Sequence, residues 1–215
     1  MGLFDRIKKA VHASANKEQL RKNVEKEMYD NNLYGYRDLK DSLEYQDSLL
    51  KRVNEAQLKY KQDGDIEAVI RELEFAFIES DPPCTTSQNI DLAKYYVKAG
   101  LKDKAWGYLN RLQMKREAPL KDIRFAQAKI LKAEKKWIDA IDMFMRGYLA
   151  KSEWNNSFQE EMFLRDIKPL ASKLGWDDRT MLQLSEMVKR HVDNKDYSER
   201  SLIDEYKKFC SEMSD

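Results

Sequence analysis

Residues 85–149, TTSQNIDLAKYYVKAGLKDKAWGYLNRLQMKREAPLKDIRFAQAKILKAEKKWIDAIDMFMRGYL, carry one pattern of small and large apolar residues twice in succession. Each pass predicts two short helices that meet at a tight turn, because apolar residues recur at spacings of three and four. The turn falls at Gly100 in the first pass and at Lys135 in the second. Ala105 and Ala140, which hold the same place in the two second helices, are 35 residues apart (140 minus 105).

A weaker copy of this pattern lies upstream, with its turn at Gly64, which stands 36 residues before Gly100 (100 minus 64). Three units at a near-constant period predict a helical solenoid or bundle and not a set of unrelated helices. Seven glycines and four prolines are too few for a fold of many short strands. The sequence therefore predicts an all-α fold, with the repeat array over residues 50–150, N-terminal helices over 1–49 and a C-terminal helical cap over 151–215.

Corresponding positions of the three units carry residues of similar size. They are Ala56, Tyr60, Gly64, Val69, Leu73, Ala76 and Pro82 in the first unit; Ala93, Tyr96, Gly100, Ala105, Leu109 and Leu112 in the second; and Ala128, Leu131, Trp137, Ala140, Phe144 and Gly147 in the third. This pattern resembles the tetratricopeptide repeat family. The resemblance implies a right-handed superhelical array of antiparallel hairpins, about three TPR-like units, with a concave groove that binds an extended or helical peptide.

Mapped position by position, the resemblance also implies partner-binding side chains on the first helix of each unit. These are Lys51, Asn54, Lys94, Lys98, Phe125, Lys129 and Lys132. The lysines of the second and third units suit an acidic segment or a C-terminal carboxylate of a partner. The alternative is that these lysines form a solvated helix face, which keeps the surface hydrated and binds no partner.

The charge balance bears on the class of partner. Charged residues make up 36% of the chain, yet 39 basic and 38 acidic side chains leave a formal net charge of +1. A dedicated nucleic-acid binder usually carries a net basic field, so the composition argues against this class.

Two sequence features bear on the compartment. Cys84 and Cys210 lie far apart and match neither a disulfide framework nor a metal motif, which is typical of free thiols in a reducing cytosol. The sequence contains neither a secretory signal nor a run of about 18 apolar residues. We therefore expect a cytoplasmic protein.

The N-terminal segment 1–15 is basic and amphipathic. Leu3, Phe4, Ile7 and Val11 would form one side of a helix, opposite a cluster of basic residues. Such a helix can lie on an anionic membrane surface or dock on a partner. It can equally be an ordinary first helix, since three positive charges attract it only weakly to a membrane.

The sequence gives no sign of catalysis. His12 and His191 are the only histidines, and neither has a partner at metal-ligand spacing. No phosphate-binding glycine loop and no nucleophile motif is present, so we expect no catalytic, cofactor-binding or metal-binding residues and no small-molecule substrate.

Trp154 is a candidate contact residue outside the groove, because it falls in a predicted loop between helices. An exposed indole in this loop would be available to a partner. The alternative is an indole that folds onto the adjacent helix and makes no such contact.

Together these observations predict a non-catalytic adaptor or regulator that binds a segment of another protein in the groove of its repeats. The alternatives are a membrane-peripheral scaffold anchored by residues 1–15 and a nucleic-acid-binding helical repeat.

Overall fold

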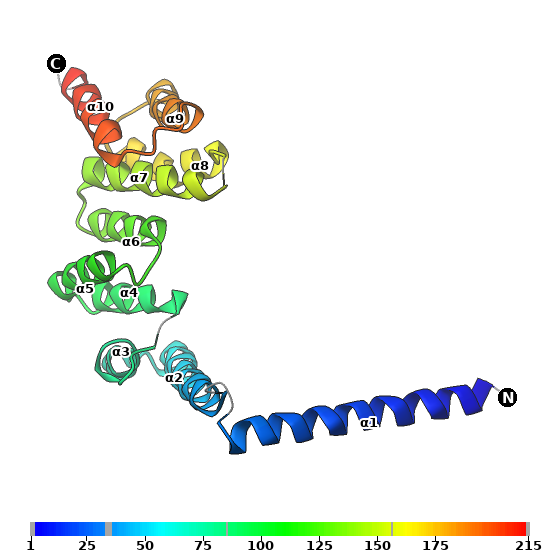
Figure 1. Ribbon diagram of the computed structural model, residues 1–215. Helices are drawn as coiled ribbons and strands as arrows, with labels where there is room; N and C mark the ends of the chain where they lie inside the picture. The colour runs from blue at the N-terminus through cyan, green and yellow to red at the C-terminus, as the bar shows by residue number, and fades with distance from the viewer. Residues whose placement is uncertain (1–2, 33–35, 85, 156, 214–215) are drawn as a thin grey trace. The chain divides into compact units, whose positions relative to one another are not determined.

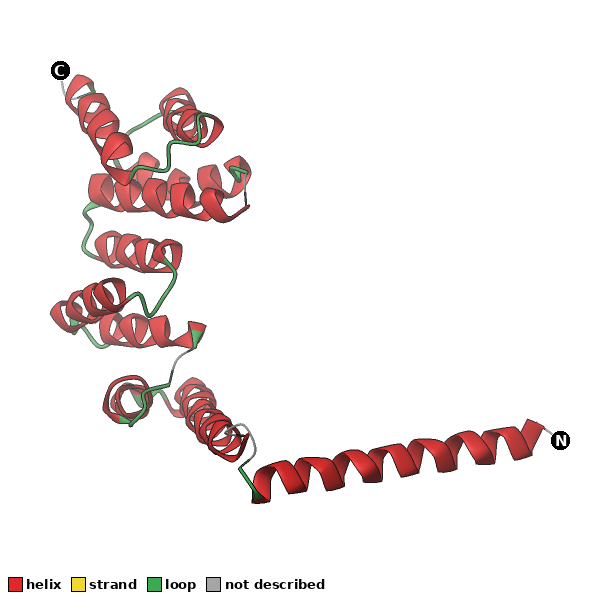
Figure 2. Ribbon diagram, in the orientation of Figure 1, coloured by secondary structure: helices red, strands yellow, loops and turns green. Residues whose placement is uncertain are grey.

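The computed structural model describes residues 3–32, 36–84, 86–155 and 157–213, and the side chains from residue 17 onward except that of Tyr36. Within these ranges the chain forms ten α-helices and no strand (Figure 2), which confirms the all-α prediction. Residues 1–55 and 56–215 form two compact units.

The first unit contains α1 (Leu3–Asp30) and most of α2 (Tyr36–Asp63). Tyr29 joins the two helices, because its hydroxyl donates a hydrogen bond of 2.9 Å to Asp41 Oδ1. The basic segment 1–15 belongs largely to α1, but its side chains lie outside the described residues, so its predicted amphipathic face stays a prediction.

The second unit begins with the end of α2 and continues as a succession of helices in which each packs against the next from α3 to α10 (Figure 1). The helices are α3 (Ile66–Glu74), α4 (Asp91–Lys98), α5 (Lys102–Lys115), α6 (Leu120–Ala133), α7 (Trp137–Asn155), α8 (Glu160–Lys173), α9 (Asp178–Asp193) and α10 (Glu199–Glu212). A π-helical turn, Phe75–Glu79, follows α3, and a 3-10 turn, Ser87–Ile90, leads into α4. The right-handed superhelical arrangement of TPR-like units stays a prediction.

The predicted turns lie where the repeat pattern placed them. Gly64, Gly100 and Lys135 have φ of 75°, 76° and 61°, the left-handed conformation that ends a helix. At Gly100 and Lys135 the helix ends in a Schellman motif. Its hydrogen bonds run from Leu101 N to Tyr96 O in the first turn and from Lys136 N to Leu131 O in the second. Lys135 therefore adopts the left-handed conformation that glycine adopts in the other two turns.

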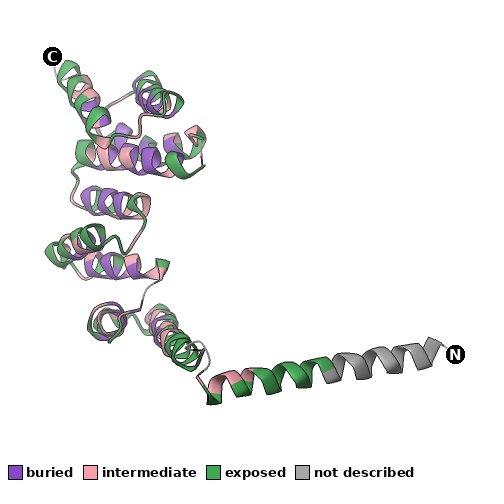
Figure 3. Ribbon diagram, in the orientation of Figure 1, coloured by how far each residue is buried: buried purple, intermediate pink, exposed green. Residues whose placement is uncertain are grey.

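The alanines of the second and third units lie in the core. Ala93, Ala105, Ala128 and Ala140 are at most 1% exposed, because their small side chains allow neighbouring helices to pack closely. One hydrophobic cluster extends from α6 through α10 (Figure 3).

Two sequence-based predictions near this core are wrong. The apolar pattern of the second helices places Leu101 and Trp137 in the core, but Leu101 is 40% exposed and Trp137 is only partly buried. Each stands at the edge of its turn. Pro169, which predicts either a kink in one helix or two short helices, lies inside the single helix α8.

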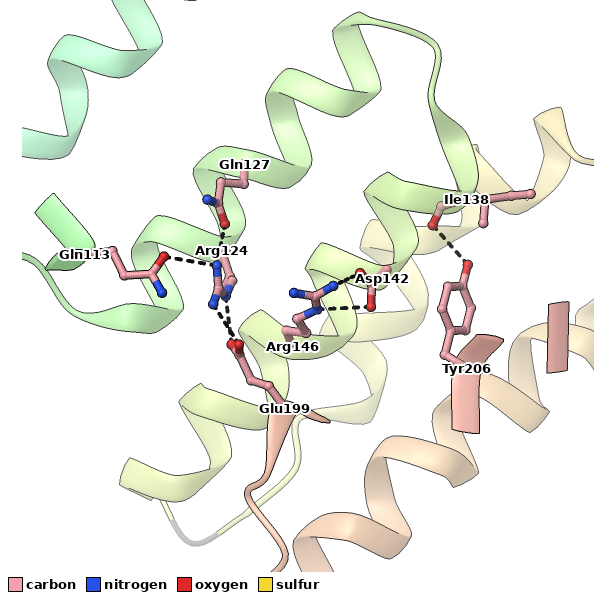
Figure 4. Close-up of polar contacts among 8 residues, drawn as sticks. All are labelled: Gln113, Arg124, Gln127, Ile138, Asp142, Arg146, Glu199 and Tyr206. Carbon is pink, nitrogen blue, oxygen red and sulfur yellow. Dashed lines mark hydrogen bonds and ion pairs between the residues drawn. The ribbon is translucent and has the colours of Figure 1, made fainter. Parts of the chain in front are cut away.

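Buried tyrosines tie helices together through their hydroxyl groups. Tyr148 of α7 donates a hydrogen bond of 2.7 Å to Asp166 of α8. Figure 4 shows a second such bond, of 3.0 Å, from Tyr206 of α10 to the carbonyl of Ile138 at the start of α7. Burial, followed by the Asp166 carboxylate, raises the pKa of Tyr148, so the phenol stays protonated and remains a donor.

Candidate functional site

An apolar groove lies between α4 and α6, the first helices of two successive hairpins. It encloses about 510 Å³. It is lined by Ser87, Ile90, Asp91, Ala93, Lys94, Val97, Lys98, Asp122, Phe125, Ala126, Lys129 and Ile130. Residues at spacings of three and four on each helix supply this lining, because they share one face.

The floor of the groove is apolar. It is formed by Ala93 and Val97 of α4, by Ile90 at the end of the preceding 3-10 turn, and by Phe125 and other apolar residues of α6. Such a floor can take apolar side chains out of water, which favours binding by about 25 cal/mol per Å² of apolar surface buried.

The position of the Phe125 ring is set by α7. The ring lies edge-on to Tyr148, with 5.1 Å between the two ring centroids. It also rests against Gly147, where an added Cβ would stand only 2.6 Å from Phe125 Cε1. Gly147 thus allows Phe125 to lie between the groove and the core, and this explains why a helical position carries glycine.

Lysines form the rim of the groove. Lys94, Lys98 and Lys129 are exposed, and in the described part of the chain none of them forms an ion pair within 4.0 Å. Two aspartates reduce the local positive charge, and one of them, Asp91, accepts a hydrogen bond of 3.2 Å from Gln57. The rim therefore carries ammonium groups that a partner's carboxylates can approach.

One end of the groove is aromatic. Lys98 Nζ lies 4.9 Å from the ring centroid of Tyr60 and 5.2 Å from that of Tyr95. The two rings meet edge-to-face, with centroids 5.4 Å apart. Burial, followed by Asp91, raises the pKa of Tyr95, so its ring stays neutral beneath the ammonium group.

The structure brings together four of the seven predicted partner-binding residues, Lys94, Lys98, Phe125 and Lys129. Lys132 lies exposed on α6, the helix of Phe125 and Lys129, but it does not line the groove. The other two, Lys51 and Asn54, are exposed on α2 in the first unit, and Lys51 lies 4.0 Å from Glu55.

Sequence reasoning missed the small members of the lining. The helical spacing of Ala93 and Val97 predicts that they share one apolar face, but it does not place them in the groove, which both of them line; Ala126, a third lining residue, was not assigned. Ala126 stands four residues before Ile130 on the same helical face, and this spacing was the available signal.

Among the described residues, no group of three or more His, Cys, Asp or Glu side chains is arranged to hold a metal ion. His191 of α9 lies 3.1 Å from carboxylate oxygens of both Asp196 and Glu205. Burial raises the pKa of the Cys84 thiol, which disfavours the reactive thiolate.

In the part of the chain that the structure describes, no helix combines the length and the apolar character that crossing a bilayer requires.

Comparison of the chain with protein-family models, with curated proteins and with solved structures found no match. The resemblance to tetratricopeptide repeats therefore rests on the repeat positions of the sequence, and the case for function rests on the groove between α4 and α6.

Proposed function

We propose that this protein is a non-catalytic interaction module, an adaptor or regulator, that binds a segment of another protein in the groove between α4 and α6. The observation that carries the proposal is the combination of an apolar floor with a rim of exposed lysines that lack ion pairs among the described residues. The matching partner segment carries apolar side chains flanked by acidic ones.

The floor supplies most of the affinity in this proposal. Burying one large apolar side chain contributes about 1.5–3 kcal/mol, whereas an exposed lysine–carboxylate pair contributes about 0.2–1 kcal/mol. The rim therefore serves mainly to select acidic segments and to orient them.

Affinity purification from the native cells, with identification of co-purifying proteins, tests the proposal with three variants. Lys94→Glu combined with Lys129→Glu reverses the rim, and Val97→Glu puts a charge on the floor. Lys168→Glu combined with Lys173→Glu is the matched control, because it makes the same charge change at exposed positions outside the groove.

A partner of the groove should be lost from both groove variants and kept by the control. A photo-crosslinking residue at position 126 should then join that partner covalently to the floor. A set of co-purifying proteins that is the same for all three variants would rule out the groove as the binding site.

A further inference from the structure

The charged side chains that line the groove between α4 and α6 follow the same order in both helices. Asp91 is the first residue of α4 and Lys98 is the last, seven residues on (98 minus 91). Asp122 lies in the first turn of α6, and Lys129 follows, again seven residues on (129 minus 122). Lys94, the fifth charged residue of the lining, lies between Asp91 and Lys98. A rise of about 1.5 Å per residue puts the lysine that ends each series about 10 Å beyond the aspartate that begins it.

α4 and α6 also point in the same direction (Figure 1). A tight turn joins α4 to α5, and the short loop 116–119 joins α5 to α6. Connections this short join antiparallel helices, so two of them restore the first direction. The groove therefore has an acidic end, at Asp91 and Asp122, and a basic end, at Lys98 and Lys129.

The charges at both ends are available to a partner. Among the described residues, none of these two aspartates and two lysines forms an ion pair within 4.0 Å. Both lysines are exposed and both aspartates are half-buried. Asp91 accepts a hydrogen bond of 3.2 Å from Gln57, a neutral side chain that leaves its charge in place. A partner can therefore form ion pairs at each end without breaking one within the chain.

The floor between the two ends favours a helical partner. Ile90, Val97, Phe125 and Ala126 are half-buried there, and their side chains carry no hydrogen-bonding group. An extended segment would place unpaired backbone N–H and C=O groups against this floor, whereas a helix pairs these groups internally. Two helical turns span about 11 Å, which matches the distance between the acidic and the basic end.

We propose, on the basis of the function proposed above, that the groove binds an amphipathic α-helix of another protein. This helix lies antiparallel to α4 and α6 and carries acidic side chains in its first turn and basic ones in its last. In this direction its first turn meets Lys98 and Lys129, and its last turn meets Asp91 and Asp122. The opposite direction would bring like charges together at both ends.

The dipoles of the helices favour the same arrangement. A helix carries partial positive charge at its N-terminus and partial negative charge at its C-terminus. The antiparallel direction therefore brings the N-terminus of the partner helix towards the C-terminal ends of α4 and α6. Acidic side chains in the first turn and basic ones in the last also stabilise the partner helix itself. The same charges thus favour both the folding and the binding of the partner segment.

Selection from two display libraries on the full chain tests the proposal. Both hold peptides of about 15 residues, or about four helical turns, with random charged residues at each end. One library has apolar residues at helical spacings, and the other has proline at every third position, which keeps its peptides extended. Val97→Glu, which puts a charge on the floor, identifies the peptides that bind in the groove. Trp154→Ala is the control, because this indole is 78% exposed in α7, in a helix and not in the predicted loop, and lies outside the groove.

The groove-dependent peptides should come from the helical library, with acidic residues in the first turn and basic ones in the last. Such a peptide should bind at least about 10-fold more tightly than the same peptide with its charged ends exchanged, because several weak charge contacts change sign together. The ratio should approach one at about 0.5 M salt, which screens exposed charges. A photo-crosslinking residue in the first turn of the peptide should join it to the basic end of the groove.

Exchanging charges within α6 tests the order without changing the net charge. Asp122→Lys with Lys129→Glu leaves one acidic and one basic residue at each end, so the two peptides should bind about equally. Glu161→Lys with Lys168→Glu is the matched control, because it makes the same exchange over seven residues (168 minus 161) at exposed positions of α8. It should keep the preference of the parent. Circular dichroism checks each fold, and Asp122→Asn with Lys129→Gln replaces the exchange should that variant lose helix.

The inference and the proposed function fail on different results. Groove-dependent peptides that show no charge order, show the opposite order or come only from the extended library would overturn the inference alone. An unchanged preference after the exchange within α6 would do the same. Both fail together if neither library yields a peptide whose binding Val97→Glu removes.

Discussion

Arg124 and Glu199 form a bidentate ion pair that connects α6 to the first turn of α10, although the two residues are 75 positions apart in the sequence (Figure 4). Arg124 Nε and Nη2 donate to the two carboxylate oxygens over 2.7 and 2.6 Å. Arg124 Nη1 donates to the side-chain oxygens of Gln127 and Gln113 over 2.8 and 3.3 Å. The guanidinium therefore joins α5, α6 and α10 at one point.

Removing one partner of this pair should be costly. The Arg124 side chain is 9% exposed, and Arg124→Met would leave the Glu199 carboxylate and two amide oxygens without their donors. We expect a loss of about 3–5 kcal/mol in the free energy of unfolding, measured by urea denaturation. Because Glu199 is 23% exposed, water should hold the loss near the lower value.

Two further variants test whether the loss of stability comes from leaving a buried charge without its partner. Arg124→Met with Glu199→Leu should recover much of the loss, since no unpaired charge remains. Lys208→Met, which breaks an exposed pair with Glu212 at 3.9 Å, should change stability by less than about 1 kcal/mol. Equal costs for Lys208→Met and Arg124→Met would contradict this account.

The sequence predicts best where structure follows from local chemistry. Asp65 directly precedes the apolar pattern of α3, which predicts a helix cap, and its Oδ1 accepts a hydrogen bond of 3.0 Å from Ala68 N. The repeat period predicts a turn at Lys135, and the positive φ of this residue confirms the prediction. Ser201 with Asp204 predicts the start of the last helix, but the cap of α10 is Ser198, three residues earlier.

Long-range pairs leave no such local trace. The 3.6-residue period placed Gln127 on a buried face, but nothing in it indicated that Arg124 is buried or pairs with Glu199. The groove was predictable in part because Lys94 and Lys129 lie on the same face of successive first helices. The support of Phe125 by Gly147 could not be predicted, since it depends on how α6 and α7 pack.

Gly147 allows a direct test of that packing. Gly147→Ala would place a Cβ 2.6 and 2.8 Å from Cε1 and Cδ1 of Phe125, so the ring must move. We expect the variant to lose about 1–3 kcal/mol in urea denaturation. Gly107→Ala is the control, because Gly107 lies inside α5 with open space around its Cα, and it should gain about 0.5–1 kcal/mol. A gain at both positions would show that Phe125 is not held against Gly147.

The turns at Gly100 and Lys135 should respond in opposite directions to substitution. Gly100 has φ of 76°, so Gly100→Ala forces an alanine into the left-handed conformation and should cost about 1 kcal/mol or more. Lys135 already occupies that conformation at φ of 61°, so Lys135→Gly should relieve the strain and gain up to about 1 kcal/mol. Thermal unfolding of both variants measures the difference. A loss of stability in Lys135→Gly would mean that its side chain contributes more than the strain costs.

Asp196, in the turn between α9 and α10, should make stability depend on acid pH. Hydrogen bonds from the Ser198 backbone and then from the Ser201 side chain, followed by the nearby His191, lower the pKa of the Asp196 carboxyl group. Because the folded pKa lies below the unfolded one, the stabilisation is present above the unfolded pKa of about 4 and is lost as the pH falls through the folded pKa.

Asp196→Asn removes the titrating group from this turn. The variant should therefore be less stable than the parent at pH 7, and the difference should shrink steadily below about pH 4. Thermal denaturation at pH 7, 5, 4, 3 and 2.5 follows this change. Asp193→Asn makes the same charge change at an exposed residue of α9 and should match the parent at neutral pH. A difference between parent and Asp196→Asn that stays constant down to pH 2.5 would contradict this account, because it would mean that ionisation of the Asp196 carboxyl group does not stabilise the turn.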